Sequence, residues 1–472
     1  MASNRRKFLK HSAILGMGML GRPVYAYSHA PKGKTKDLPL HHETDICVLG
    51  GSCTGVFAAV RAARLGARVT IIEKQNAFGG VATNALVFVW HSLKNTTFDK
   101  DIIAGCTRET MDRLQKRSAV IEKDGNPSGA FRFNSQELKI ELDEMVLEEG
   151  IKPMLHTWYS EPVTDSNGHL TGIVVQNKDG RSVIKAHQFI DATGDGDLAM
   201  SLGIASYTAE QLLPPTTCAH IDGYNKVRWE VNDLLKKHHE EFNIPLGFVW
   251  GNNIPDSSSF MLAGTRVYGA DCSKAEDLTK AEMEGRKQVR AIMDMIRKYH
   301  PEHDLSLTAL PSLIGIRQTR QFHCMHQLTG EEVLNGTSFE DAIAYGSYRV
   351  DIHHQDKPGI TFKYLDGTQE YVVSGKDRVK SRWREKTETN PTYYQIPLRS
   401  IIPGKYNNLI LAGRMLDADL VAFSGVRVMV NMNQLGEAAG VAAYLAAQQN
   451  KPIAEVNAEQ VRKTLNKGGS VL

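Results

Sequence analysis

The fold is decided by residues 44–74, which read TDICVLGGSCTGVFAAVRAARLGARVTIIEK. An apolar run from Ile46 to Leu49 ends at paired glycines, and a helical pattern of small residues then runs from Thr54 to Leu65. A β-branched run, Val69 to Ile72, follows and leads to an acid, Glu73. Strand, glycine turn, helix, strand and acid in this order predict a dinucleotide-binding βαβ unit.

The glycine turn would bring backbone close to a pyrophosphate, and the helix N-terminus would add unpaired N–H groups and a positive dipole. Glu73 lies eighteen residues after Gly55, about the spacing expected of the acid that takes the ribose hydroxyls. Ser52 replaces the middle glycine of the fingerprint, and its small side chain hinders phosphate approach only slightly. The alternative is a structural βαβ crossover without a nucleotide. The predicted nucleotide contacts in this unit are Gly50, Gly51, Ser52, Cys53, Thr54, Gly55, Glu73 and Lys74.

Composition is that of a globular protein. The chain has 472 residues, of which 42% are hydrophobic and 23% charged, and this length favours two connected domains. The formal net charge is +3, but residues 1–30 hold five of the 56 basic residues and no acid. The remaining 51 basic residues against 53 acidic ones give −2, so we expect no basic surface for nucleic acid.

The N-terminus is typical of an export signal. Residues 3–10 read SNRRKFLK and precede an apolar stretch, SAILGMGMLG, that is too short to span a membrane. The pair Arg5–Arg6 resembles the twin-arginine signal, whose route carries folded proteins; an ordinary secretory signal is the alternative. We expect a signal peptide over residues 1–30, a polar linker over 31–43, and a periplasmic or otherwise exported mature chain without a membrane span.

The sequence predicts no metal centre. The six cysteines are widely spaced without a CxxC pair, which argues against iron–sulfur or zinc clusters and leaves a disulfide open. Residues 191–199, DATGDGDLA, hold three aspartates, but a glycine-punctuated turn beside a nucleotide explains them better than a metal does. His238 and His239 lie in a charged helical stretch, where a solvated face is the simpler interpretation. The cysteines are Cys47, Cys53, Cys106, Cys218, Cys272 and Cys324.

Further elements are predicted along the chain from hydrophobic periodicity and turn residues. Residues 151–191 contain several short strand-like runs separated by hairpin signals. The other expected elements are a helix over Ser135–Glu149, a long amphipathic helix over Leu278–Lys298, a polar strand-like run over 313–323, a charged loop-like stretch over 366–390, an apolar strand ending in glycine over 408–414, and an alanine- and glycine-rich helix over Asn433–Ala447.

Several motifs follow one another in a characteristic order: Gly50–Gly55 with Glu73-Lys74, Gly79-Gly80, Asp191–Ala199, Gly264–Asp271, Ile314–Arg320, Asp351–His354, Gln395–Pro403, Asn408–Arg414 and Gln434–Ala443. Together they resemble the FAD-dependent oxidoreductases of the glutathione-reductase-like fold. The resemblance implies an α/β protein in which a Rossmann-like, glutathione-reductase-type FAD-binding domain carries an inserted α+β substrate or cap domain. The implied boundaries are 44–205 with 396–450 for the FAD-binding domain, 206–395 for the cap domain and 451–472 for a C-terminal tail.

The resemblance also implies roles outside the first unit. The final helix near Gln434 and Gly436 would face the pyrimidine edge of the flavin, where a helix N-terminus stabilises negative charge. In many flavoproteins the residue after the late glycine is acidic, but here it is Arg414, which puts direct pairing with a ribityl hydroxyl by a carboxylate in doubt. The remaining implied contacts are Gly79 and Gly80 along the ring system, Thr193, Gly194 and Asp195 along the nucleotide, and Gly413 at the phosphates.

Proton transfer needs a second group beside a flavin, commonly a histidine. His323 and His353 are the candidates, with a hydrogen-bonded structural role as the alternative for each. Arg317 and Arg320 are candidates for clamping a substrate carboxylate or stabilising charge on the flavin, with an interdomain salt bridge as the alternative. The weaker candidates are His91, Arg266 and Arg399.

The sequence therefore predicts an exported FAD-dependent oxidoreductase that transfers a hydride between the flavin and a small organic substrate, at a hydroxyl, amine or activated C=C carbon. A quinone, a redox protein or oxygen would exchange electrons with it. The alternatives are an NAD(P)-dependent oxidoreductase, and a non-catalytic secreted ligand-binding protein built on a flavoprotein scaffold.

Overall fold

The computed structural model describes residues 38–123, 125–354, 356–373 and 376–472. The predicted signal peptide and most of the predicted linker lie outside the described residues. Residues 38–472 form one compact unit, and its division into an FAD-binding and a cap domain stays a prediction.

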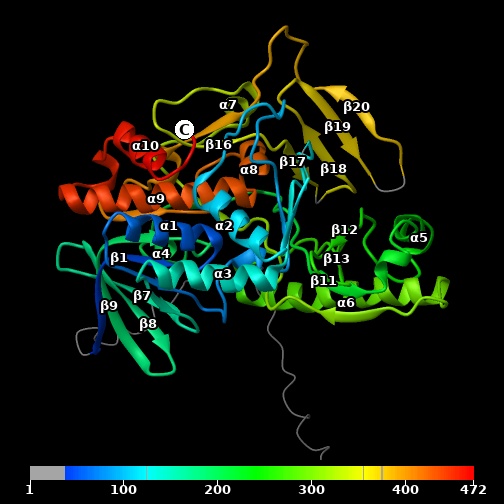
Figure 1. Ribbon diagram of the computed structural model, residues 1–472, viewed down its shortest axis with the longest axis horizontal. Coiled ribbons are helices and arrows are strands. Elements are labelled where there is room, and N and C mark those ends of the chain that lie inside the picture. Colours follow the sequence, from blue (N-terminus) through cyan, green and yellow to red (C-terminus); the bar gives the residue numbers. More distant parts are fainter. Residues whose placement is uncertain (1–37, 124, 355, 374–375) are drawn as a thin grey trace, which may run out of the picture. The chain divides into compact units, whose positions relative to one another are not determined.

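A seven-stranded sheet carries the predicted βαβ unit (Figure 1). Its strands follow the order β6-β2-β1-β9-β8-β7, and β22 pairs with the carboxyl-terminal part of β9. Leu49 of β1 lies beside Ile72 of β2 and Asp191 of β9, so the parallel strands end at one edge. The strands are β1 (Leu40–Leu49), β2 (Val69–Ile72), β6 (Lys152–Met154), β7 (Trp158–Thr164), β8 (Leu170–Asn177), β9 (Gly180–Asp191) and β22 (Leu409–Leu411).

Strand β1 begins at Leu40, inside the stretch predicted to be a linker. Its first residues alternate little in hydropathy, yet they pair with β9 from Leu40 onward. From Ile46 the strand is buried on both faces, with Ile46 and Val48 in one apolar cluster and Cys47 and Leu49 in another. This explains the continuous apolar run, which is typical of a parallel strand covered on both sides.

Helix α1 (Cys53–Arg64) lies along helix α9 (Met429–Gln449) (Figure 1). The two backbones meet at glycines of α9, because a Cβ on Gly436 would overlap the carbonyl of Thr54 and one on Gly440 that of Ala58. The small residues of α9 thus let the two helices dock closely. The helix begins at Met429, four residues before the predicted Asn433.

A buried ion pair joins α1 to α9. Arg61 pairs with Glu437, and its Nη1 donates to the carbonyl of Gly468 at 2.6 Å. Glu437 also accepts from the backbone N–H of Cys106 at 3.1 Å. Residues 451–472, predicted as a tail, therefore contribute to the core around α1, and they contain helix α10 (Ala458–Lys467).

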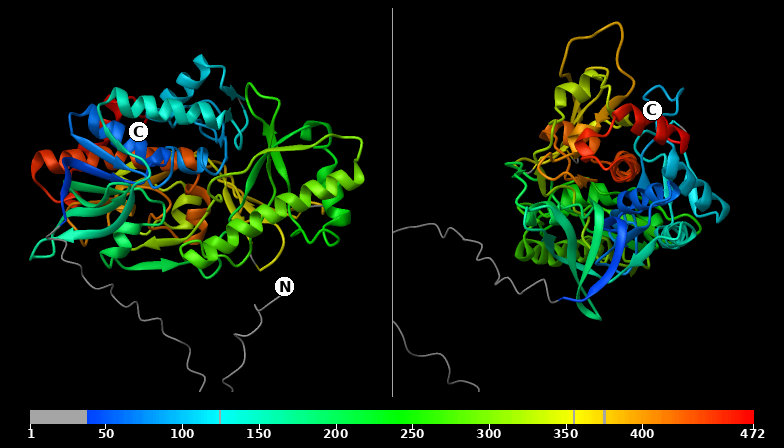
Figure 2. Two further views of the ribbon diagram at one scale, coloured as in Figure 1. Left: turned by 90° about the horizontal axis from the view of Figure 1, so that it is seen from below. Right: turned by 90° about the vertical axis from the view of Figure 1, so that its left-hand side faces the viewer.

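Among its described residues, the region predicted as the cap holds two four-stranded antiparallel sheets. The first has the strand order β12-β13-β11-β14 and packs against the long helix α6 (Ala275–Tyr299), as Figure 2 shows. The second has the order β17-β18-β19-β20. The strands are β11 (Cys218–Asp222), β12 (Trp250–Asn253), β13 (Phe260–Ala263), β14 (Ser306–Ala309), β17 (Val350–His353), β18 (Ile360–Lys363), β19 (Thr368–Val372) and β20 (Val379–Arg382).

Two sequence predictions in this region were wrong. Residues 366–390 contain β19 and β20, because ladder hydrogen bonds form between backbones even where strand side chains are polar and largely exposed. Residues 313–323 contain only the short strand β15, since their backbone instead bonds to other loops, as between Gly315 and Thr216.

The remaining elements surround these sheets. Among the described residues no helix is long and apolar enough to cross a membrane, and none of the six cysteines is paired. The elements are α2 (Gly105–Lys116), α3 (Ser135–Glu148), α4 (Asp197–Ser201), α5 (Val231–His238), α7 (Gly330–Asn335), α8 (Leu420–Val426), β3 (Val89–Trp90), β4 (Val120–Glu122), β5 (Phe131–Phe133), β10 (Ser206–Thr208), β15 (Arg320–Phe322), β16 (Ala342–Gly346) and β21 (Tyr394–Pro397).

The contact between α1 and α9 leaves no room for a methyl group. We expect Gly440→Ala to push the helices apart and to destabilise the protein by about 1–3 kcal/mol. The control is Gln448→Ala, an exposed position on the same helix, which should leave the thermal midpoint unchanged. Equal thermal midpoints for the two variants would contradict the close contact.

Candidate cofactor and substrate site

A cavity of about 600 Å³ lies at the edge where the parallel strands end. The residue after each of four strands lines it: Gly50 after β1, Glu73 after β2, Ala192 after β9 and Ala412 after β22. Ligands of open α/β sheets bind at such an edge. Other predicted contacts in the lining are Ser52, Cys53, Thr54, Lys74, Gly79, Gly80, Thr193, Gly194, Asp195, Gly413 and Arg414.

The turn after β1 has the close backbone approach that the glycine pattern predicts. Gly50 has φ +96°, and a Cβ there would overlap the carbonyl of Ala192. A Cβ on Gly55 would overlap the carbonyl of Gly50, so Gly55 shapes the turn from beneath and does not line the cavity. Ser52 caps α1, since its Oγ accepts from the backbone N–H of Gly55 at 3.4 Å. The serine that replaces the middle glycine of the fingerprint thus caps the N-terminus of α1.

Glu73 is buried at the end of β2 and its carboxylate faces the same turn. It accepts from the backbone N–H of Gly51 at 2.6 Å and from that of Gln75 at 2.7 Å. Gly51 therefore supports Glu73 and is not in the cavity lining. The role of Glu73 toward a ribose stays a prediction.

Asp191, the last residue of β9, and Asp195, in the turn that follows, have different partners. The carboxylate of Asp191 accepts from the backbone N–H groups of Leu198 and Ala199, at 3.0 and 3.1 Å, and so caps α4. Burial raises its pKa to about 6. Asp195 pairs with Arg414 at 2.6 Å. Burial opposes its ionisation, but the guanidinium and a hydrogen bond from Thr319 together keep the pKa of Asp195 below its usual value. Arg414 occupies a position that is acidic in many flavoproteins, and Asp195 neutralises its charge.

The start of α9 reaches the cavity, but through residues other than those expected. Val428, Met429, Met432 and Asn433 line it. Gln434 and Gly436 do not. The amide of Gln434 exchanges two hydrogen bonds with the backbone of Tyr345, at 3.1 and 2.8 Å, and Gly436 faces α1. The error in the helix start by four residues, about one turn, moved the predicted contacts away from the true N-terminus.

The catalytic candidates separate into two groups. His353 and Arg317 line the cavity, whereas His323 and Arg320 do not. The side chain of His323 is 60% exposed, and its ring lies 4.9 Å from that of Tyr207. Arg320 donates to the carbonyl of Ser273 at 3.0 Å. These two predictions are not supported, because neither side chain lines the cavity.

The weaker candidates divide in the same way. Arg266 and His91 line the cavity, and burial, followed by the nearby Arg349, lowers the pKa of His91 to about 3. Its ring lies 4.0 Å from that of Tyr348. Arg399 lies outside the lining and pairs with Asp341 at 3.0 Å.

His353 forms a dyad with Asp351. Its Nε2 lies 3.1 Å from Asp351 Oδ1, and the hydroxyl of Tyr348 donates to Asp351 Oδ2 at 2.9 Å. Burial lowers the pKa of His353 to about 4 although Asp351 acts to raise it, so the imidazole is neutral at pH 7. Burial opposes ionisation of Asp351, but His353 and Arg427 hold its pKa well below the usual range. His353 Nδ1 is buried and has no hydrogen-bond partner among the described residues.

Sequence reasoning missed Asp351, Tyr348, Arg349 and Arg427 as site residues. One signal was available, because residues two apart on a strand share a face, and Asp351 and His353 both lie on β17. The two arginines lie in loops before β17 and after α8, and no local pattern marks them.

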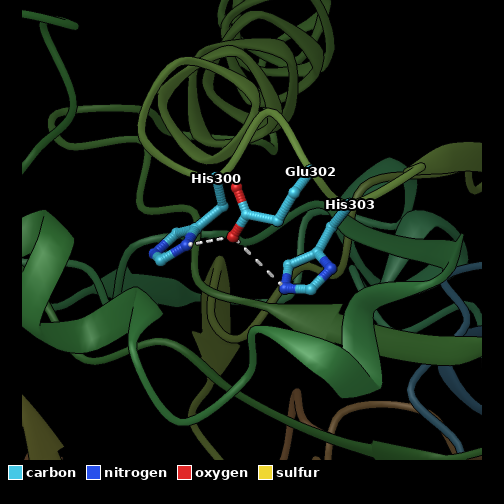
Figure 3. Close-up of side chains that lie close together, drawn as sticks. All are labelled: His300, Glu302 and His303. Atoms are coloured by element: carbon cyan, nitrogen blue, oxygen red, sulfur yellow. Dashed lines mark hydrogen bonds and ion pairs between the residues drawn. The ribbon is translucent and has the colours of Figure 1, made fainter.

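One group of metal-ligating side chains occurs among the described residues: His300, Glu302 and His303, which follow α6 (Figure 3). Glu302 Oε1 lies 3.2 Å from His300 Nδ1 and 3.5 Å from His303 Nε2. His300 Nε2 also lies 3.1 Å from Glu230. None of these residues lines the cavity, and the contacts of the two glutamates with the histidines account for their arrangement.

A family model described as FAD dependent oxidoreductase matches residues 45–465. The chain belongs to this family. The FAD-dependent oxidoreductase thus has an α/β, Rossmann-like FAD-binding fold, and its cofactor is FAD. The glutathione-reductase-type subclass stays a prediction.

The similarities to single proteins are limited in sequence identity or in coverage. Dihydrolipoyl dehydrogenase of Bacillus subtilis (strain 168) is 34% identical over 109 residues, which make up 21% of this chain and 23% of that protein. A geranylgeranyl bacteriochlorophyll reductase-like protein from Thermoplasma acidophilum is 12% identical, with a TM-score of 0.45 over 91% of this chain and 84% of that one. The myxobacterial chondrochloren halogenase CndH is 11% identical, with a TM-score of 0.43 over 90% and 79%.

The residues of the cavity fit FAD. The turn at Gly50 keeps side chains away from the N-terminus of α1, which suits a pyrophosphate. The buried carboxylate of Glu73 follows β2, where a ribose is expected. The start of α9 supplies a positive dipole where the resemblance places the flavin.

The tight turn gives a direct test of cofactor binding. We expect Gly50→Ala to abolish co-purification of FAD, because the added methyl group meets Ala192 and the positive φ is strained. The control is Gly66→Ala, which has φ +102° but nothing within 4 Å of its Cβ. It should keep the visible flavin absorbance, and loss of flavin from both variants alike would contradict a specific role of the turn.

Proposed function

We propose that this oxidoreductase transfers a hydride between FAD and a small organic substrate, at a hydroxyl, amine or activated C=C carbon, with His353 as the acid–base group. The observation that carries the proposal is the neutral, unpartnered Nδ1 of His353 in the same cavity as the FAD cradle. Bound FAD supplies the hydride-accepting or hydride-donating chemistry.

The chain's own residues would handle the proton. In the oxidative direction, a substrate hydroxyl or ammonium would release its proton to His353 Nδ1 as the carbon loses a hydride; in reduction, His353 would return the proton. The contact between Nε2 and Asp351 favours the tautomer with hydrogen on Nε2, which leaves a lone pair on Nδ1. Asp351 would then stabilise the imidazolium that forms, and Tyr348 holds Asp351 in place.

Export and an external electron partner complete the proposal. The Arg5–Arg6 motif supports export by the twin-arginine route, which carries folded proteins. A quinone, a redox protein or oxygen would exchange electrons with the flavin. Family membership favours this enzyme over the NAD(P)-dependent alternative. The non-catalytic alternative makes a different prediction, namely that no ligand reduces the bound flavin.

The two histidine candidates give a matched pair of variants. We expect His353→Gln to slow anaerobic flavin reduction by about 10²–10⁴-fold while FAD stays bound, since the variant lacks the proton acceptor. His323→Gln should reduce at the wild-type rate. The assay monitors flavin absorbance against a panel of sugars, hydroxy acids and amines.

The pH dependence follows from the same group. Because His353 has a pKa of about 4, its basic form persists well below neutral pH, and the oxidative rate should fall only as the pH approaches 4. His353→Gln should lose this acidic limb. Equal rates for His353→Gln and the wild type would remove His353 from the mechanism.

A further inference from the structure

Four arginines surround the end of the cavity that holds the dyad. Arg266, Arg317, Arg349 and Arg427, called here the arginine cluster, come from four separate segments, and all line the cavity. A fifth lining arginine, Arg378, instead pairs with Glu370 at 3.5 Å.

The charge of the arginine cluster is not balanced by protein carboxylates. Among the described residues, three carboxylates line the cavity, and two of these, Glu73 and Asp195, belong to the nucleotide end. The third, Asp351, lies 3.7 Å from Arg427. No described carboxylate lies within 4.0 Å of the guanidinium of the other three arginines. Four positive groups thus face one negative group.

The guanidinium groups are held in place by neutral partners. Arg349 donates to Ser128 Oγ at 2.6 Å and lies over the ring of Phe362, 4.1 Å from its centroid. Arg266 donates to the carbonyls of Gly264 and Phe248, at 3.2 and 3.1 Å, and Arg317 donates to that of Pro214. These bonds orient the groups without neutralising them.

Buried donors in the cluster remain without partners. The Nε atoms of Arg349 and Arg427 are buried and form no hydrogen bond. Burial, followed by Arg427 and Arg266, lowers the pKa of Arg317 to about 10. Grouped, partly dehydrated like charges with unused donors are unfavourable unless an anion completes the site.

The FAD phosphates do not account for the cluster. The glycine turn and the N-terminus of α1, with Lys74 and the Arg414–Asp195 pair, make up the nucleotide end. No hydrogen bond or ion pair between described residues joins them to the arginine cluster. We infer that the substrate is a small organic anion, whose carboxylate, sulfate or phosphate oxygens are bound by the arginine cluster while its reacting carbon lies beside His353. This inference rests on the proposed function. Guanidinium groups suit all three oxyanions because their paired N–H donors match two oxygens.

The test compares matched acidic and neutral compounds on the FAD-loaded protein: glycerate and glycerol 3-phosphate against glycerol, and glucuronate against glucose. Binding is measured by the change in flavin absorbance and in thermal midpoint, and turnover by anaerobic flavin reduction. We expect at least one acid to bind at least tenfold tighter than its neutral partner and more weakly at high ionic strength. Preference for glycerate or for glycerol 3-phosphate distinguishes the two oxyanion types.

Variants assign the binding to the cluster. We expect Arg317→Gln and Arg349→Gln each to raise the dissociation constant of the acid by roughly tenfold to a hundredfold, and Arg317→Lys to recover part of the loss. The control is Arg286→Gln, an α6 surface residue paired with Glu282, which should change nothing. Two cluster positions are used so that one misfolded variant leaves the other informative.

Two results would overturn the inference. One is equal binding of acids and their neutral partners by the wild type. The other is unchanged acid binding in both cluster variants together with a lower flavin potential, which would assign the arginines to the flavin. Failure of the proposed function is distinguishable, because acids would then bind through the cluster but no compound would reduce the flavin.

Discussion

The close contact between the glycine turn after β1 and the end of β9 is the constraint on which the site depends. Gly50 lies against the carbonyl of Ala192, and a side chain there would separate two neighbouring strand ends. The same requirement recurs where α1 meets α9 at Gly436 and Gly440. These backbone contacts keep the carboxyl edge of the sheet and the start of α9 on the same cavity.

The two ends of that cavity differ in how charge is compensated. At the nucleotide end, Asp195 neutralises Arg414 and backbone N–H groups satisfy Glu73. At the other end Asp351 pairs with His353, but most of the arginine cluster lacks a carboxylate. An arginine that pairs with a carboxylate of the protein contributes to the folded state. An arginine without such a carboxylate can instead contribute its interaction energy to binding an anionic ligand. The nucleotide end is therefore largely complete in the protein alone, and the substrate end is not.

The sequence predicted the parts of the fold that local pattern determines. The βαβ unit, the helix over Ser135–Glu148 and the helix α6 were found because hydrophobic period and glycine position specify them. The start of α9 was misplaced by one turn, since Met429, Val430 and Met432 are apolar and give no boundary signal. This error carried Gln434 and Gly436 into the predicted site.

The substrate half was less predictable for a physical reason. Its residues meet through antiparallel sheets and loops distant in sequence, so no spacing records that His91, Arg349 and Arg427 surround Asp351. Nothing in the sequence distinguished His323 from His353 as the acid–base candidate. Only the structure separates them: His323, just after β15, is exposed, whereas His353, on β17, is buried.

The buried pair between Arg61 and Glu437 has a consequence for synthesis of the chain. Its members are 376 positions apart, and Arg61 also bonds to Gly468. Before α9 has been synthesised, nothing covers α1. The guanidinium of Arg61 then has no carboxylate with which it could form a buried ion pair. The first βαβ unit can therefore complete its packing only after α9 and Gly468 have been made. We expect stable cofactor binding to require the same step.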